Sequence, residues 1–491
     1  MRKILFLVVF SSFLCLQSGA VTTDSDISSE AGRKTEKSKK VEVDANGNKI
    51  KKGWNFGVLP CIAYDADKGF QYGALINLYD YGDGKNYPQY RHSLYAEASY
   101  TTKKNGNFRL YYNSSYLIPK HWVAFDISYL PDAMMDFYGF NGKQSVYNWQ
   151  WADDKKGESD YMTRAFYKRK SNLFRTSADI SGTITGNLKW IAGIGVLGFM
   201  NSDVDVKKAD LPTDQTELYK LYKEWGIISA AEDKGGWHPF VRTGVKFDTR
   251  NAVTNPSKGM FADAFFTYSA AFGDLADYNY LGLNVDFRHY VSLVKNRLTL
   301  AYRICSQTVI AGNAPYYADN YLNMLEPTRN IYDGLGGKNS FRGVLRNRIL
   351  ADGIIYGTLE LRSRIAFFDI GRQHFYIGLV PFMDFGMITK ARKLDRDIAV
   401  NSFNLYKEIP TSQTYIATHQ NTGTTRETDP GSIDSYLDFN SNIHIPHFSA
   451  GLGFRAAMNE NFVLSVDWAM PFDKQDSNKW ANIYVGFGYL F

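Results

Sequence analysis

The last nine residues, 483–491, read Ile-Tyr-Val-Gly-Phe-Gly-Tyr-Leu-Phe, with an apolar or aromatic side chain at every odd position. A period of two residues is the pattern of a β-strand whose two faces meet different surroundings. A single aromatic residue at a chain end is common, but five alternating apolar residues that finish on one are not. The stretch therefore predicts the closing strand of a β-barrel that lies in a bacterial outer membrane.

The same alternation recurs within the chain, for example over residues 280–291. One face of this segment carries Leu281, Leu283, Val285 and Phe287, and the other carries Gly282, Asn284, Asp286 and Arg288. A soluble β-sandwich would bury the apolar face, whereas a membrane barrel turns it toward lipid and keeps the charges in the lumen. Alternation alone does not separate these folds, so the N-terminus, the length and the last strand decide between them.

The amino-acid composition favours the membrane barrel. Aromatic residues make up 15% of the chain, with 34 Tyr and 33 Phe, yet the mean hydropathy is −0.32. A barrel with one apolar and one polar face averages to mild hydrophilicity and carries aromatic side chains at both membrane interfaces. The sequence shows no amphipathic helical periodicity, and its best apolar run, 190–200, is too short for a transmembrane helix.

The N-terminal residues predict secretion. Residues 1–20 combine Arg2 and Lys3 with an apolar stretch and small residues up to Ala20, which is the pattern of a cleavable signal peptide. A membrane anchor helix would need about 20 apolar residues. Residues 21–53 are polar and lysine-rich, and these 33 residues fall below the roughly 40 usually needed for independent folding. We expect them to form a flexible periplasmic tail.

Charge, cysteine and histidine content exclude several other classes. The net charge of +6 falls to +4 without Arg2 and Lys3, which is too weak and dispersed for a nucleic-acid-binding protein. Two cysteines remain after residue 20, Cys61 and Cys305, so disulfides are not the framework of the fold. The eight His residues give neither a metal-ligand spacing nor a Ser-His-carboxylate grouping that we can place on one rim. We expect no catalytic residue, no metal and no cofactor.

Residues 54–491 divide into strands, which predicts an all-β, transmembrane, antiparallel barrel of about 16 strands. The candidates are 54–64, 69–80, 90–102, 106–117, 121–130, 162–184, 188–202, 238–248, 260–271, 277–291, 297–310, 353–367, 373–386, 445–458, 461–471 and 479–491. The long connections, 131–161, 203–237, 311–352 and 387–444, all follow odd-numbered strands. Bacterial barrels show this asymmetry, with long extracellular loops and short periplasmic turns.

Charged and aromatic residues gather on the predicted luminal side around the loop 311–352. The group comprises Phe341, Arg342 and Gly343 in the loop, Glu360 and Arg362 on the next strand, and Phe382, Asp384 and Gly386 on the strand after it. The loop is long enough to fold back into the barrel, where Asp384 and Glu360 can accept the Arg342 guanidinium in a bidentate pair. A loop anchored in this way would plug the lumen. Alternatively, the charges line a water-filled channel, which the residues alone favour.

These segments also resemble a known family. Phe341-Arg342-Gly343, Glu360-x-Arg362 and Phe382-x-Asp384-x-Gly386 resemble, in order and spacing, the motifs of the BamA/TamA superfamily of outer-membrane insertases and translocators. The segment 248–259, with Asp248-Thr249-Arg250, Asn255-Pro256 and Gly259, resembles the periplasmic turn that opens the family's C-terminal barrel region, the bacterial surface antigen domain. The resemblance covers about 240–491. It implies that the sixth external loop enters the lumen and that Arg342 pairs with Asp384.

The resemblance implies a role in outer-membrane protein assembly or translocation. Family members normally carry periplasmic POTRA domains, which 33 residues cannot contain, so we expect a divergent, POTRA-less member that acts with a partner. The expected partners are outer-membrane lipid and either other assembly proteins or a periplasmic subunit, and not nucleic acid. The alternative is a passive channel or a structural surface protein. An enzymatic barrel ranks below both, and the sequence does not identify the client.

The expected mechanism uses the first and last strands, 54–64 and 479–491, as a weakly paired lateral seam. Gly57 on one strand, with Gly486 and Gly488 on the other, would soften the pairing, and Phe491 ends the closing strand. An opened seam exposes unpaired backbone that can template an incoming strand. The alternative is a closed seam in which the glycines allow close packing.

Overall fold

The computed structural model describes one barrel with its loops. The residues described are 50–65, 69–85, 89–152, 162–205, 217–252, 255–320, 333–370, 373–408, 433–458, 462–478, 480–487 and 489–491. The chain divides into two units, Met1–Ile50 and Lys51–Phe491, and the barrel is the second unit. The predicted signal peptide and nearly all of the predicted tail lie outside the described residues.

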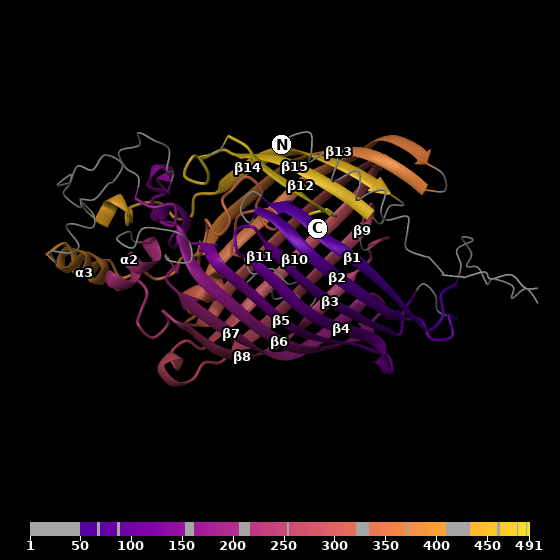
Figure 1. Cartoon of the computed structure of the whole chain (residues 1–491), viewed down its shortest axis with the longest axis horizontal. Coiled ribbons are helices and arrows are strands. Elements are labelled where there is room, and N and C mark those ends of the chain that lie inside the picture. The colour runs from indigo at the N-terminus through magenta and orange to yellow at the C-terminus, as the bar shows by residue number, and fades with distance from the viewer. Residues whose placement is uncertain are drawn as a thin grey trace, which may run out of the picture. The chain divides into compact units, whose positions relative to one another are not determined.

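The second unit is a closed barrel of sixteen antiparallel strands, which confirms the predicted fold class (Figure 1). The strands are β1 (Trp54–Asp65), β2 (Gly69–Asp80), β3 (His92–Thr101), β4 (Gly106–Ile118), β5 (His121–Asp136), β6 (Lys168–Thr185), β7 (Leu188–Ser202), β8 (Gly235–Asp248), β9 (Gly259–Ser269), β10 (Tyr280–Val294), β11 (Leu298–Gly312), β12 (Gly353–Ile370), β13 (Gln373–Lys390), β14 (His447–Met458), β15 (Phe462–Pro471) and β16 (Asn482–Phe487). Each strand pairs with its neighbours in sequence, and β1 meets β16 to close the barrel.

Polar side chains point into the barrel and apolar side chains point out. In β10, Asp286 and Arg288 are buried, while Leu283 and Phe287 on the other face are part-exposed. The outward faces of the barrel carry large exposed apolar side chains, among them Phe266, Ile304, Leu359 and Met383. A soluble sandwich would show the opposite arrangement, so the alternation seen in the sequence is that of a barrel in lipid.

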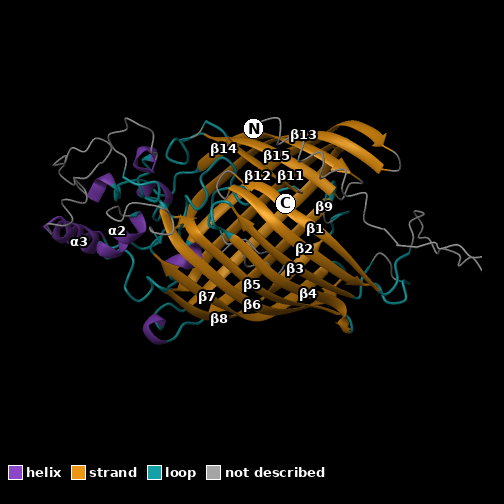
Figure 2. Ribbon diagram, in the orientation of Figure 1, coloured by secondary structure: helices purple, strands orange, loops and turns teal. Residues whose placement is uncertain are grey.

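The four long connections, 137–167, 203–234, 313–352 and 391–446, all follow odd-numbered strands and so leave the barrel at one end. The described parts of these connections contain two α-helices, α2 (Leu218–Glu224) and α3 (Arg396–Glu408). The same described parts contain four short 3-10 helices, η1 (Gly142–Gln144), η2 (Trp149–Ala152), η4 (Tyr316–Asn320) and η6 (Ile433–Ser435). A further one, η3 (Gly273–Leu275), lies in the shorter link between β9 and β10. Figure 2 shows helices gathered at this end of the barrel.

An aromatic cap joins these loops. Its buried members include Phe137, Phe140, Tyr219, Tyr222, Trp225, Tyr316, Phe403 and Tyr436, and Leu130, Leu173, Phe199 and Phe240 from the strand ends pack in the same cluster. Burying aromatic side chains is strongly favourable and holds loops that are far apart in sequence against the outer ends of the strands. None of the helices in the described part of the chain is long and apolar enough to cross a membrane.

The prediction for the closing strand is wrong at its C-terminal end. Regular pairing in β16 stops at Phe487, and Tyr489–Phe491 turn into the lumen instead of continuing along the lipid face. Phe491 is only 8% exposed and packs with Tyr290 of β10 and Ala301 of β11. Aromatic side chains suit lipid, but they also suit contact with buried guanidinium groups, which the lumen supplies.

Candidate functional site in the lumen and at the seam

The loop between β11 and β12 enters the barrel and packs against its inner wall. Phe341 and Val344 of this loop are fully buried in one cluster with Cys305, Ile354 and Tyr356 of the wall. The backbone turns that allow this need glycine, because Gly336 and Gly343 have φ values of +124° and +89°. The loop therefore fills luminal space that a passive channel would leave to water.

Arg342 at the tip of this loop meets Asp384 of β13 in a bidentate ion pair. Arg342 Nε lies 2.9 Å from Asp384 Oδ2, and Nη2 lies 2.9 Å from Oδ1. The Arg342 backbone N–H also donates to Oδ2 at 3.0 Å, and the Thr358 hydroxyl donates to Oδ1. Both side chains are fully buried. This geometry is the strong fork-to-carboxylate arrangement, which fixes the direction of the loop as well as its position.

Glu360 of β12 is shared between two arginines. Its Oε1 lies 2.9 Å from Arg342 Nη1, and its Oε2 accepts from Arg362 Nε at 2.8 Å. Asp467 of β15 is shared in the same way, at 3.5 Å from Arg342 Nη1 and 2.6 Å from Arg455 Nη1 of β14. Three arginines thus face three carboxylates, counting Asp384, so the buried network is neutral overall.

The sequence did not single out Asp467 and Arg455. Both are buried charged side chains on lumen-facing positions of their strands, so a search for charges at the lumen-facing positions could have found them. Their pairing with the loop depends on how far the loop reaches into the barrel, which the alternation along a strand does not encode. Because burial opposes the charged form while Asp384 and Glu360 favour it, the pKa of Arg342 is held above its usual range.

The aromatic and glycine residues of the motifs shape the space around this network. The Phe382 ring centre lies 3.4 Å from the Arg342 guanidinium carbon, a stacked cation–π contact. A Cβ atom at Gly386 would come within 2.9 Å of the Phe341 ring, so glycine makes room for that ring against β13. The structure therefore brings all eight residues of the predicted loop site together.

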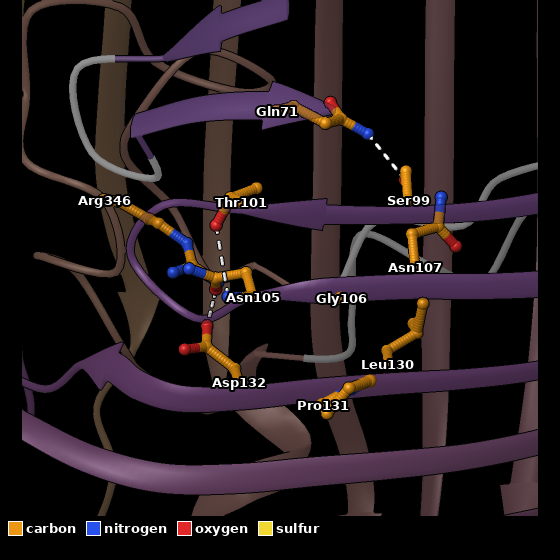
Figure 3. A pocket seen from close by; sticks show the side chains of 10 residues that line it. All are labelled: Gln71, Ser99, Thr101, Asn105, Gly106, Asn107, Leu130, Pro131, Asp132 and Arg346. Carbon is orange, nitrogen blue, oxygen red and sulfur yellow. Dashed lines mark hydrogen bonds and ion pairs between the residues drawn. The ribbon is translucent and has the colours of Figure 1, made fainter. Parts of the chain in front are cut away.

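A second ion cluster ties the loop to the wall at β5. Arg346 lies 2.9 Å from Asp132, 2.5 Å from Asp333 and 3.6 Å from Asp136. The cavity beside it has a volume of about 160 Å³ and a mixed polar and apolar lining (Figure 3). It is lined by Gln71, Ser99, Thr101, Asn105, Gly106, Asn107, Leu130, Pro131, Asp132 and Arg346. No group of three or more His, Cys, Asp or Glu in the described ranges is arranged to hold a metal ion.

The periplasmic turn between β8 and β9 also reaches the lumen. The Asn255 amide is buried and donates to the Tyr376 hydroxyl of β13 at 2.8 Å. In the same turn, Arg250 forms an ion pair with Asp248 at 2.8 Å. The turn therefore contacts a strand that is not its neighbour in the barrel, at the end opposite the aromatic cap.

The barrel closes through a very short ladder. Among the described residues, only two pairs join β1 to β16, Tyr64 with Val485 and Asp65 with Tyr484, whereas twelve join β1 to β2. This ladder is short, and both described glycines of the predicted seam are regularly paired on the other edge of their strands. Gly57 pairs with Asn77 of β2, and Gly486 pairs with Ser465 of β15. Gly488 lies outside the described residues, and Phe491 lies on the far wall instead of at the seam.

Gly486 has a different role, which the sequence did not suggest. Lys338 of the luminal loop passes over it, and its Nζ donates to the Val485 backbone carbonyl at 3.0 Å. A Cβ atom at Gly486 would collide with this ammonium group. The same loop contacts β16 twice more: the Asn482 amide donates to the Gly343 carbonyl at 2.9 Å, and the Gly343 N–H donates to the Tyr484 hydroxyl at 3.3 Å.

Three of the solved structures that are similar to this chain have low sequence identity to it. BamA from Haemophilus ducreyi lacking POTRA domains 1–3 is 14% identical, with a TM-score of 0.49, over 90% of this chain and 71% of that one. CdiB from Escherichia coli is 10% identical, with a TM-score of 0.48, over 89% of this chain and 62% of that one. CdiB from Acinetobacter baumannii is 12% identical, with a TM-score of 0.41, over 90% and 61%. No curated protein matches the sequence.

The family match confirms the resemblance drawn from the sequence motifs. The Omp85 superfamily domain matches residues 92–491, which is most of the chain. Members of this superfamily are transport and assembly barrels of the bacterial outer membrane and are not enzymes. The protein therefore belongs to the Omp85 superfamily and lies in the bacterial outer membrane.

Proposed function

We propose that this protein assists the assembly or translocation of outer-membrane clients by presenting the open edge of β1 to an incoming strand. The observation that carries the proposal is the two-pair ladder between β1 and β16, set against the twelve pairs between β1 and β2. Within the part of the chain that the structure describes, β1 from Trp54 to Ala63 has a regular partner on its β2 side only.

An open strand edge in a membrane favours pairing with another strand, and the reason is physical. Water is absent from the bilayer core, so each unsatisfied backbone group there costs several kcal/mol. A client strand that adds to β1 satisfies those groups, and alternate side chains of that strand reach lipid and lumen. Lipid-facing side chains on this part of β1, such as Phe56 and Val58, are 78% and 57% exposed, so the outer surface beside the edge is apolar.

The filled lumen supports this function over passive conduction. A channel needs a continuous aqueous path, whereas here the buried loop carrying Arg342 occupies the lumen and the aromatic cap joins the outer loops. Large, steady currents through the purified protein in lipid bilayers would instead support the channel alternative.

We also propose that the protein works with other outer-membrane assembly proteins or a periplasmic subunit. The described residues form the barrel and its loops, so delivery of a client falls to segments outside them or to another protein. Capture of a periplasmic or outer-membrane assembly protein with the native barrel would support this part of the proposal.

A disulfide lock tests whether the seam acts. Tyr64 and Val485 are direct partners across the seam, so Tyr64→Cys with Val485→Cys can form a disulfide there. The matched control locks β1 to β2 through Tyr64→Cys with Phe70→Cys, which are also direct partners. We expect oxidation of the seam lock to reduce the level of outer-membrane clients, reductant to restore it, and the control lock to have no effect. Equal client levels with both locks, and after depletion of the protein, would refute the proposed function.

A further inference from the structure

We propose that a luminal clamp, formed by Lys338, Arg362 and Arg455, holds β16 and Tyr489–Phe491 away from β1 and so keeps the seam open. This inference deepens the proposed function and takes its biological meaning from it. The position of the strand, however, can be measured without any client.

The first part of the clamp acts on β16 itself. Lys338 Nζ donates to the carbonyl of Val485, one of the two β16 residues that pair with β1. Lys338 approaches from the lumen over Gly486, which leaves space for it because it lacks a side chain. A charge-assisted hydrogen bond to the backbone of this strand draws β16 toward the loop just where its ladder with β1 ends.

The second part acts on the residues after β16. Arg362 Nη2 donates to the backbone oxygen of Phe491 at 3.0 Å, and its guanidinium carbon lies 4.2 Å from the centre of the Tyr489 ring and 4.8 Å from that of the Phe491 ring. Arg455 lies 5.2 Å from the same Tyr489 ring centre. The Tyr489 hydroxyl also lies 3.2 Å from the Tyr376 hydroxyl on β13. These contacts, with those of Phe491 to Tyr290 and Ala301, place the segment on the wall formed by β10 to β14, away from β1.

The two arginines of the clamp, Arg362 and Arg455, each share a carboxylate with Arg342 of the luminal loop. Glu360 contacts Arg342 with one oxygen and Arg362 with the other, at 2.9 and 2.8 Å. Asp467 contacts Arg342 at 3.5 Å and Arg455 at 2.6 Å. Because each carboxylate serves the loop and the terminal segment together, displacement of the loop weakens the hold on the segment.

The segment held by the clamp is the one that could extend the seam. In the antiparallel register set by Tyr64 with Val485, five further steps would place Leu490 opposite Leu59. In the structure Leu490 packs instead against the luminal cluster of Tyr290, Ala301 and Phe491. The edge of β1 and the clamp therefore compete for the same residues, and the clamp holds them in this structure.

A disulfide cross-link shows whether the edge of β1 or the clamp holds the segment Tyr489–Phe491. In a background with Cys61→Ser and Cys305→Ala, the pair Leu59→Cys and Leu490→Cys forms a disulfide only when the ladder extends. We expect little cross-linking with the clamp intact. Lys338→Met and Arg362→Met, tested separately, should each raise the cross-linked fraction at a fixed oxidation time, by about tenfold for the loss of one charge-assisted hydrogen bond.

Two controls keep the test decisive. The pair Tyr64→Cys with Val485→Cys should cross-link in every variant, which shows that the barrel has closed. Lys258→Met, which removes an exposed charge from a periplasmic turn, should leave the Leu59–Leu490 cross-link low. Lys338 is only half-buried, so its variant carries the test if Arg362→Met fails to fold.

The outcomes separate the clamp from the proposed function. Efficient cross-linking of Leu59→Cys to Leu490→Cys in the unaltered clamp, or no increase in the folded clamp variants, would overturn the inference. If the Leu59–Leu490 cross-link rises in the clamp variants as expected but the seam locks leave client levels unchanged, the clamp is supported and the proposed function is refuted.

Discussion

Replacing Arg342 with methionine should detach the luminal loop from the barrel wall. Arg342 provides the only ion pair that Asp384 makes among the described residues, whereas Glu360 also pairs with Arg362. The variant therefore leaves one buried carboxylate, Asp384, with hydrogen bonds from the Thr358 hydroxyl and a backbone N–H but no cation. Removing one partner of a buried ion pair costs about 3–5 kcal/mol, so we expect the free energy of unfolding to fall by that amount.

A double variant separates the ion pair from a general loss of packing. Arg342→Met with Asp384→Asn removes both charges of the pair, and methionine keeps part of the apolar stem of the arginine. No unpaired charge remains on Asp384, so the double variant should be more stable than the sum of the single variants predicts. Contacting residues show such coupling energies of about 0.5–3 kcal/mol. Asp384→Asn alone should cost less than Arg342→Met, because Glu360 still faces Arg342 at 2.9 Å.

Two measurements check the anchor. Urea unfolding of the refolded barrel, followed by tryptophan fluorescence and heat-modifiable mobility, gives the free energies. Conductance in planar bilayers reports the loop, and Arg342→Met should open larger and more frequent currents than the unaltered protein. Arg297→Met, which removes an exposed arginine from a turn, is the matched control and should change neither quantity. The reasoning is refuted if Arg342→Met unfolds at the same urea concentration as Arg297→Met and conducts no more than it does.

Three further predictions concern the loops and the periplasmic turn. Burial raises the pKa of Glu217, at the start of α2, from 4.5 to about 7. The folded state therefore binds more protons than the unfolded state between these values, and the free energy of unfolding should fall by about 3 kcal/mol as pH rises through them. Glu217→Gln should abolish this slope in unfolding curves at pH 5 and pH 8. Arg346→Gln leaves Asp132 without its 2.9 Å partner and should make the luminal loop cleavable by protease added outside, while an unchanged cleavage pattern would contradict the tie to β5. Asn255→Ala removes the hydrogen bond to Tyr376 and should lower protection from hydrogen exchange in the turn after β8 by about 1 kcal/mol.

The barrel wall was predictable because lipid imposes a strict rule on its strands. Every second side chain must suit lipid, so period-two alternation persists along each strand and stops where the strand leaves the membrane. The range 188–202 predicted for one strand is the range that β7 occupies. The Arg342–Asp384 pair was anticipated through the resemblance to the BamA/TamA superfamily, because the residues alone allowed the pair but favoured charges that line a water-filled channel.

Other features of the structure depended on competition between alternative tertiary contacts, which the sequence does not display. Tyr489 and Phe491 continue the alternation of β16, yet they lie in the lumen because Arg362 is within reach of both rings. The extension of β5 to Asp136, beyond the predicted end at 130, depends on pairing with Arg169 and Lys168 of β6 across a loop of some thirty residues. Such long-range packing is set by tertiary contacts, which the local pattern of residues along the chain does not predict.

The luminal network and the seam must influence each other in both directions. Glu360 and Asp467 each serve the loop anchor and the clamp, so releasing Arg342 should favour extension of the seam. Linkage then requires that extending the seam weakens the loop anchor by the same free energy. Oxidising the Leu59→Cys and Leu490→Cys pair in an Arg362→Met background draws the terminal segment to β1, so conductance should rise toward that of Arg342→Met. If the extended seam leaves conductance at its starting value, the loop and the seam are independent, and the shared carboxylates are structural only.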